Sequence, residues 1–279
     1  MNPLRSQIRD RVHQMVRAGE MQIVRPDGDP GLFGAGSETW RIHQDFSAML
    51  IGGVASLLTQ MLHPGALAGV WDHSNWRDDP HGRLGRTARF VGVTTYGGTA
   101  QAEQAIATVR RIHDRVAGTL PDGTAYAATD PALLRWVHVA EVDAFLRAHV
   151  RYREPGMPGT RQDRYLGEMA DLARRMGAGE VPATRRDVAA YFRAMRPTLR
   201  HDERTRDVAA ALMAQAGGDA VAAKSITGGL GQVVMQAGVE LMHPWAAAMH
   251  GLTTSAVRRP AIRAGASAAA GVLRWALKG

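Results

Sequence analysis

Apolar residues in this chain recur mainly at every third or fourth position, the spacing that places them on one face of an α-helix. Residues 4–16 carry an apolar side chain at every fourth position. Residues 40–62 form a longer, strongly apolar run, which Ser37 caps and the sequence His63-Pro64-Gly65 ends. No extended alternation of apolar and polar residues demands a sheet. The pattern therefore predicts an all-α fold, which we expect to form a single helical domain over residues 1–279.

Residues 83–96 are the ambiguous element, because their β-branched side chains would also suit a strand. Leu84, Ala88 and Val91 nevertheless keep one helical face apolar. Gly97-Gly98 then supplies a natural helix end. We therefore predict a helix over this segment.

Turn and capping residues predict the other boundaries. A helix over residues 99–116 is expected to end at Gly118, before a turn at Pro121-Asp122-Gly123. Asp130-Pro131 supplies an N-cap and a first-turn proline for a helix over residues 132–150. Loops are expected at residues 25–36, 72–82, 153–160 and 176–182, and a last helix is expected beyond Pro260.

The absence of cysteine narrows the possible chemistry. It excludes a disulfide framework, a thiolate-ligated haem, a zinc–cysteine site, an iron–sulfur cluster and a cysteine nucleophile. An iron centre in this chain would therefore use histidine or carboxylate ligands.

The net charge of +8 does not indicate a nucleic-acid surface. Nearly all basic residues are arginines, and they are spread along the chain among acidic residues instead of forming one cluster. We expect no nucleic-acid partner. The N-terminal residues show no secretory signal, and the longest apolar run, residues 48–58, is shorter than the ~20 residues that a membrane span needs. The sequence thus predicts a cytoplasmic protein without a transmembrane segment.

Arg83, Thr87 and His113 are the most informative polar residues. Arg83 and Thr87 are four residues apart, so a helix places them one turn apart on one face. His113 belongs to the next predicted helix, which can fold back against the first. A cation, a hydroxyl and an imidazole in an apolar interior suit a haem pocket or another oxygen-handling site. The charged neighbours of His113 are equally compatible with a residue on a polar helix surface.

The other histidines are weaker candidates for a metal-binding or catalytic role. His138 and Glu141 form an i, i+3 pair, but a di-iron carboxylate site needs two Glu-x-x-His motifs, and only Glu240 and His243 fit that pattern. We therefore expect His138 to be a hydrogen-bonded histidine beside Trp136. His63 and His243 each precede a proline and are expected to be helix-end or packing residues.

An ordered set of short motifs resembles the bacterial latex-clearing protein (rubber oxygenase) superfamily, which includes fungal ER-bound oxygenases. The resemblance covers residues 38–150 well and the C-terminal half loosely. The motifs are Trp40; Gln60-x-x-His63-Pro64; Asp79-Pro80; Arg83-Leu84-x-Arg86-Thr87; Tyr96-Gly97; His113 and Gly118; Asp122-Gly123-x-x-Tyr126; and Asp130-Pro131-x-x-Leu134-x-Trp136-Val137-His138.

The resemblance implies an all-helical fold with a globin-like core around one haem b. By position, His113 matches the iron ligand of the family, and Arg83 and Thr87 match its pocket arginine and threonine on the other side. Members that cleave rubber carry a lysine where this chain has Arg86, and a guanidinium stays protonated and does not readily bind iron.

Those members also have a pocket glutamate upstream, whereas this chain has no glutamate between Glu38 and Glu103. Asp72, Asp78 and Asp79 are partial substitutes. Rubber cleavage is therefore not expected.

Together these features predict a haem b-dependent oxygenase or oxidase that acts on a small apolar molecule with dioxygen or peroxide. His113 is the predicted metal ligand, and Arg83, Arg86 and Thr87 are the predicted catalytic or haem-contacting residues. Two alternatives stay open at this point: a non-catalytic haem-binding sensor or carrier, and a helical relative without a cofactor.

Overall fold

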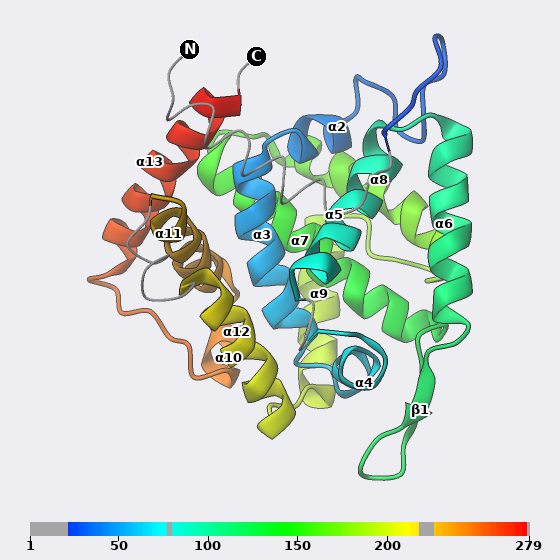
Figure 1. The fold of residues 1–279 in the computed structure, drawn as a ribbon, viewed down its shortest axis with the longest axis vertical. Coiled ribbons are helices and arrows are strands. Elements are labelled where there is room, and N and C mark those ends of the chain that lie inside the picture. The colour runs from blue at the N-terminus through cyan, green and yellow to red at the C-terminus, as the bar shows by residue number, and fades with distance from the viewer. Residues whose placement is uncertain (1–21, 77–79, 218–225, 278–279) are drawn as a thin grey trace.

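The computed structural model describes residues 22–76, 80–217 and 226–277. Within these ranges it describes the backbone alone for residues 80–84, 215–217 and 226–228, and the side chains as well for all others. The helix predicted at residues 4–16 lies outside this part of the chain. The described residues are predominantly helical, and the prediction of an all-α fold is confirmed (Figure 1).

The described helices follow one another with short connections. In chain order they are α2 (Glu38–His43), α3 (Phe46–Gln60), α4 (Pro64–His73), α5 (Pro80–Tyr96), α6 (Thr99–His113), α7 (Pro131–Tyr152), α8 (Gly159–Met176), α9 (Arg185–Met195), α10 (Glu203–Gly217), α11 (Ile226–Leu241), α12 (Pro244–Met249) and α13 (Arg259–Leu277). A 3-10 turn, Arg196–Thr198, follows α9.

The run predicted as one helix over residues 40–62 is two helices, so the prediction of a single element was wrong. Ser37 caps α2 as expected, because its side chain accepts a hydrogen bond from the backbone N–H of Trp40. Asp45 starts α3 by accepting a hydrogen bond from the backbone N–H of Ala48 at 2.9 Å. A second N-cap within the apolar run thus separates the two helices.

A β-hairpin interrupts the helices between α6 and α7. The helix predicted to reach residue 116 ends at His113, and β1 (Ala117–Thr119) pairs antiparallel with β2 (Ala125–Ala127) around the predicted turn. The backbone N–H of Ala128 also donates to the carbonyl of Val116. This pairing brings the start of α7 back beside the end of α6.

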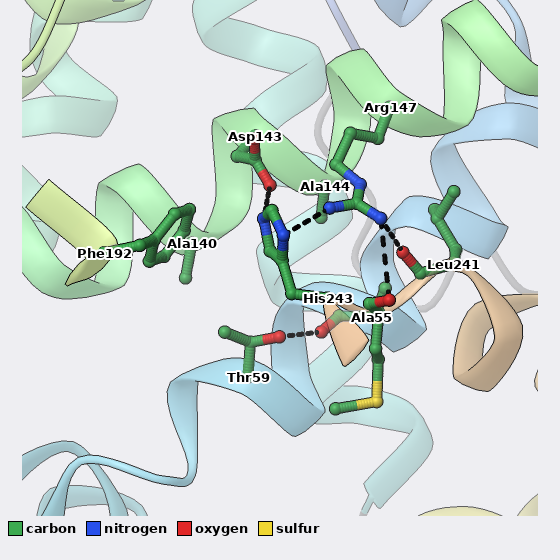
Figure 2. A pocket seen from close by; sticks show the side chains of 10 residues that line it. Ala55, Thr59, Ala140, Asp143, Ala144, Arg147, Phe192, Leu241 and His243 are labelled. Carbon is green, nitrogen blue, oxygen red and sulfur yellow. Dashed lines mark hydrogen bonds and ion pairs between the residues drawn. The ribbon is translucent and has the colours of Figure 1, made fainter. Parts of the chain in front are cut away.

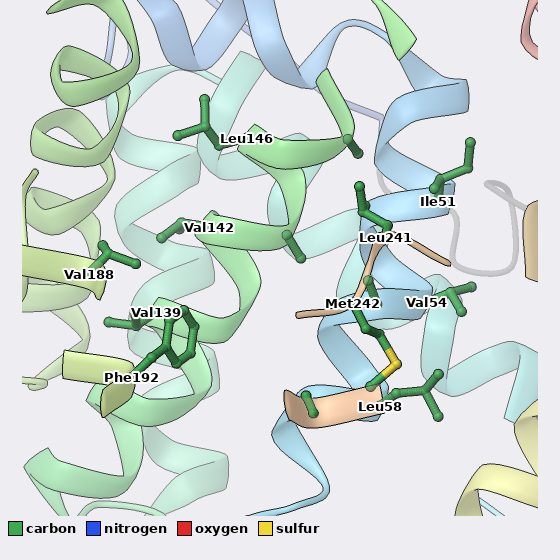
Figure 3. Close-up of a cluster of buried hydrophobic side chains, with 14 of the residues drawn as sticks. Ile51, Val54, Leu58, Val139, Val142, Leu146, Val188, Phe192, Leu241 and Met242 are labelled. Carbon is green, nitrogen blue, oxygen red and sulfur yellow. The ribbon is translucent and has the colours of Figure 1, made fainter. Parts of the chain in front are cut away.

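The core is built around the contact between α3 and α7 (Figure 3). A Cβ atom at Gly52 of α3 would lie 2.9 Å from Cδ1 of Phe145 in α7, so only glycine allows the two backbones to approach this closely. Helix α11 covers another side of α3, and α8 packs on α7. The buried side chains of this core include Ile51, Val54, Leu58, Val139, Val142, Leu146, Phe192, Leu241 and Met242.

Among the described helices, none is by itself both long and apolar enough to cross a bilayer. Helices α3 and α4 together meet the length and composition criteria, but the chain bends by 104° between them. Most of α3 is buried within the protein core.

Candidate functional site

Helices α5 and α6 form an antiparallel pair joined at Gly97-Gly98, as the sequence predicted. Because the pair turns at these glycines, the start of α5 is level with the end of α6. Arg83 and Thr87 near the start of α5 are therefore brought to the same end of the pair as His113, the last residue of α6. The side chain of Arg83 lies outside the described part.

Burial changes along the described part of α5. Arg86 and Thr87 are exposed, whereas Phe90 and Val93, on the same helical side as Arg86, are half-buried and buried. Thr94, seven residues after Thr87, is also buried.

His113 faces the interior from the end of α6. It follows Ala102 and Ile106, which are buried on the same helical side. Burial lowers the pKa of His113 below its usual value, against the smaller opposite effect of Asp114. Its Nδ1 atom is buried and has no hydrogen-bond partner among the described residues. The side chain is thus a neutral imidazole with an unsatisfied ring nitrogen, which is the form that binds a metal.

Helix α7 carries a histidine and a glutamate on one side. Leu134, His138 and Glu141 follow one another on this side and are each partly accessible. Burial nevertheless lowers the pKa of His138 to about 4 and raises the pKa of Glu141 to about 7. The surroundings of both side chains therefore disfavour their charged forms.

The hairpin places the start of α7 beside the end of α6, and α5 packs on α6. Residues of these three helices that keep accessible surface are Arg86 and Thr87 of α5, His113 of α6, and Leu134, His138 and Glu141 of α7.

A buried polar chain that sequence reasoning missed connects α2, α5 and α8. His43 of α2 is hydrogen-bonded through Nδ1 to Oγ1 of Thr95 in α5 at 2.8 Å, and through Nε2 to the hydroxyl of Tyr165 in α8 at 3.0 Å. Burial lowers the pKa of His43 to about 3, so the ring is neutral. Burial, and to a smaller extent the charge of Glu141, raises the pKa of Tyr165.

His243 lies in a second polar cluster (Figure 2). The residues of α7 in this cluster are on the side of the helix away from His138 and Glu141. Arg147 donates from its guanidinium to Nδ1 of His243 at 2.6 Å, and Nε2 of His243 donates to Asp143 at 2.8 Å. The cavity beside these residues measures about 10 Å³, room for a single water molecule. The cluster therefore joins α7 to the end of α11 and does not form a substrate site.

The structure also shows the contacts of most of the other histidines and carboxylates considered as site residues. His63 caps α4 by accepting from the backbone N–H of Gly65, which confirms its helix-end role. His138 makes no hydrogen bond with another described residue, contrary to the prediction. Asp72 accepts a hydrogen bond from the hydroxyl of Tyr126 at 2.8 Å and so fastens the hairpin to α4. Asp78 and Asp79 lie outside the described part.

No group of three or more histidine or acidic side chains among the described residues could hold a metal ion. His138 and Glu141 therefore have no third metal-ligating side chain beside them among the described residues. This part of the chain offers no support for a di-iron site. A histidine-ligated cofactor that brings its own remaining ligands needs only one protein ligand. The unsatisfied imidazole of His113 fits that requirement.

Comparisons with known proteins give one significant match. The family model described as ER-bound oxygenase mpaB/B'/Rubber oxygenase, catalytic domain, matches residues 40–275. The match extends well beyond residues 38–150, where the motifs are densest. No curated protein and no solved structure matches significantly. Because the family model covers most of the 279 residues, the chain belongs to the family of ER-bound oxygenase and rubber oxygenase catalytic domains.

Proposed function

We propose that this protein is a haem b-dependent oxygenase that acts on a small apolar molecule with dioxygen or peroxide. The observation that carries the proposal is His113 at the end of α6: burial lowers the pKa of its imidazole, and its buried Nδ1 atom has no hydrogen-bond partner in the described part of the chain. Its position also matches the iron ligand implied by the motif resemblance. Haem b, when bound, would supply the redox chemistry that the side chains of this chain lack.

The candidate residues of α5 and α6 would have separable tasks. His113 would hold the iron through one ring nitrogen. Arg83, Arg86 and Thr87 belong to α5, and they would supply positive charge and hydrogen-bond donors to an oxygen ligand or to the haem propionates. The membership of an oxygenase family and the position of these residues in α5 support this assignment.

Apolar side chains on α5 and α7 favour an apolar substrate. Phe90 and Val91 of α5 and Leu134 and Val137 of α7 are each partly accessible, and Phe90, Leu134 and Val137 also pack against the hydrophobic core. Such side chains would exclude water from the reacting atoms and bind hydrocarbon-like groups through the hydrophobic effect. Arg86 replaces the lysine of the rubber-cleaving members, so the proposal does not extend to rubber cleavage.

The absorption spectrum of the purified protein tests this proposal. We expect a Soret band that is present in the wild type, absent in His113→Ala and retained in His201→Ala. His201 is a suitable control because it is also half-buried and has no hydrogen bond to another described residue. Circular dichroism would show whether each variant keeps its helices.

A colourless protein that also fails to bind added haemin would contradict the proposal. A haem-loaded protein that consumes neither dioxygen nor peroxide with a panel of apolar substrates would instead be a carrier or sensor. The two results separate loss of the cofactor from loss of catalysis.

A further inference from the structure

Two histidines from different parts of the chain meet near the end of α3. His250 is the C-cap of α12, and His201 lies in the connection between the 3-10 turn and α10. Their ring centroids are 5.2 Å apart, and the ring planes cross at 81°, so the rings do not stack. The backbone N–H of Arg200 donates to the carbonyl of Leu62 at 2.8 Å, which holds the segment of His201 against the residues that follow α3.

The protonation of His250 follows from its one hydrogen bond. Its Nε2 atom lies 2.8 Å from the carbonyl oxygen of Leu58. Because a carbonyl oxygen only accepts, Nε2 carries the proton and Nδ1 keeps its lone pair. This Nδ1 atom is buried and has no hydrogen-bond partner among the described residues. Burial lowers the pKa of His250 below its usual value, against the smaller opposite effect of the bond to Leu58, so the imidazole is neutral.

This is the arrangement of a histidine that binds a metal ion. In such a histidine one ring N–H donates to a backbone carbonyl or a carboxylate, which fixes the orientation of the ring and leaves the other nitrogen for the metal. His201 makes no hydrogen bond with another described residue, so its ring can turn a nitrogen toward His250. It is also half-buried, which leaves this side of the pair open to solvent.

The separation of the two rings agrees with a tetrahedral ion between them. With metal–nitrogen distances of about 2.0–2.1 Å, two imidazoles at a tetrahedral angle have ring centres about 5 Å apart. A linear two-coordinate ion would place the ring centres about 6 Å apart at the same bond lengths. The observed 5.2 Å therefore favours the tetrahedral geometry, and imidazole ligands in that geometry suit Zn²⁺.

The remaining positions around such an ion fall to water. The described residues contain no group of three or more histidine or acidic side chains that could hold a metal ion. Asp202, the residue after His201, is engaged at the start of α10, where its Oδ1 atom accepts from the backbone N–H and the hydroxyl of Thr205 at 2.9 Å each. The pair therefore supplies two ligands from the protein.

We propose that His201 and His250 form a zinc site, in which Nδ1 of His250 and one ring nitrogen of His201 bind the ion and water completes the coordination. The ion joins the end of α12 to the connection before α10. Through the bonds to Leu58 and Leu62, both segments are also attached to the end of α3. The site stabilises the fold and takes no part in the proposed haem chemistry.

Calorimetric titration of the haemin-free protein with Zn²⁺, in a buffer without chelators, tests the site. We expect the wild type to bind one equivalent with an affinity that falls at least about tenfold in His201→Ala and in His250→Gln. The amide of the glutamine can still donate to the carbonyl of Leu58, so that variant removes the Nδ1 ligand and keeps the hydrogen bond. His73→Gln removes an exposed histidine at the end of α4 and should bind zinc as the wild type does.

X-ray absorption at the zinc edge identifies the ligands directly, and two imidazoles with additional oxygen ligands are expected. Zinc should also raise the thermal unfolding temperature of the wild type but not of His201→Ala, and circular dichroism checks that each variant is folded. Equal zinc affinity in the wild type and both variants, or a loss in only one of them, would overturn the two-histidine site. So would the absence of saturable zinc binding by the folded wild type. Because every measurement uses protein without haemin, failure of the proposed function leaves this test intact.

Discussion

Gly238 of α11 lies directly against Val54 of α3, so that a Cβ atom at position 238 would be 2.5 Å from Cβ of Val54. Neither position can move easily, because Val54 is in the middle of α3 and Gly238, in the last turn of α11, packs directly on it. The approach of α11 to α3 therefore depends on the absence of a side chain at Gly238.

Gly238→Ala should destabilise the protein by roughly 1–3 kcal/mol, because the added methyl forces the two helices apart. Chemical denaturation followed by circular dichroism measures the free energy of unfolding. Gly271→Ala is the matched control, since Gly271 is also in a helix and no atom lies within 4 Å of its Cβ position. That control should be neutral or more stable by about 0.5–1 kcal/mol. Equal effects of the two variants would contradict the packing account.

Arg147→Ala should destabilise the protein by roughly 1–3 kcal/mol, because it leaves acceptors at the end of α11 without their donor. Arg147 donates to the carbonyl of Leu241 at 2.6 Å as well as to His243. Arg147→Lys keeps the charge but cannot donate in both directions from a planar group, and it should recover only part of the stability. Full recovery with lysine would show that charge alone matters here.

Acid should destabilise the protein through its buried histidines. Burial holds the pKa of His138 at about 4, below the value of 6.5 expected in the unfolded chain. The unfolded chain therefore binds the proton first, so stability that is present above pH 6.5 is lost as pH falls toward 4. The contribution is at most about 3 kcal/mol.

In His138→Gln, the free energy of unfolding should fall less between pH 6.5 and 4 than in the wild type. Comparing each variant with the wild type at every pH removes the opposite contribution of Glu141, whose raised pKa lowers stability as pH rises from 4.5 toward 7. His73→Gln is the control, because His73 is exposed at the end of α4. A pH dependence in His138→Gln equal to that of the wild type would contradict the burial account.

Thr87→Ala should keep haem but change the spectra of the oxygen- and cyanide-bound protein, because it removes a donor on the side opposite His113 in the proposed arrangement. Ala88→Ser adds a hydroxyl at the neighbouring position, which points away from the side of Thr87, and should leave the spectra unchanged. Unchanged spectra in Thr87→Ala would make Thr87 a packing residue.

The elements that the sequence predicted well have strong local signals. The cap at Ser37, the His63-Pro64 junction and the Asp130-Pro131 helix start depend on side chains that bond their own backbone or fix its angles, so each can be read without knowledge of distant contacts. The break at Asp45 was missed because the apolar pattern continues across it. The short strands around Asp122-Gly123 were missed because three residues are too few to establish an alternation.

The site was predictable in part for the same reason. Spacing alone placed Arg83 and Thr87 one turn apart, and the glycine turn brought their helix against that of His113. The desolvation of His138 and Glu141 could not be predicted from the sequence, because it depends on which distant elements cover α7. The bonds of His43 to Thr95 and Tyr165 likewise join residues from three separate helices.

Helix α7 packs on α3 with one side and keeps accessible surface on another. Trp136 and Val139 on the packed side are fully buried, whereas His138 and Glu141 on the other side keep accessible surface. Substitutions on the two sides are therefore subject to different constraints. At Trp136 and Val139 they leave cavities or overpack the core, whereas at positions 138 and 141 they change charge and hydrogen bonding with a smaller loss of packing.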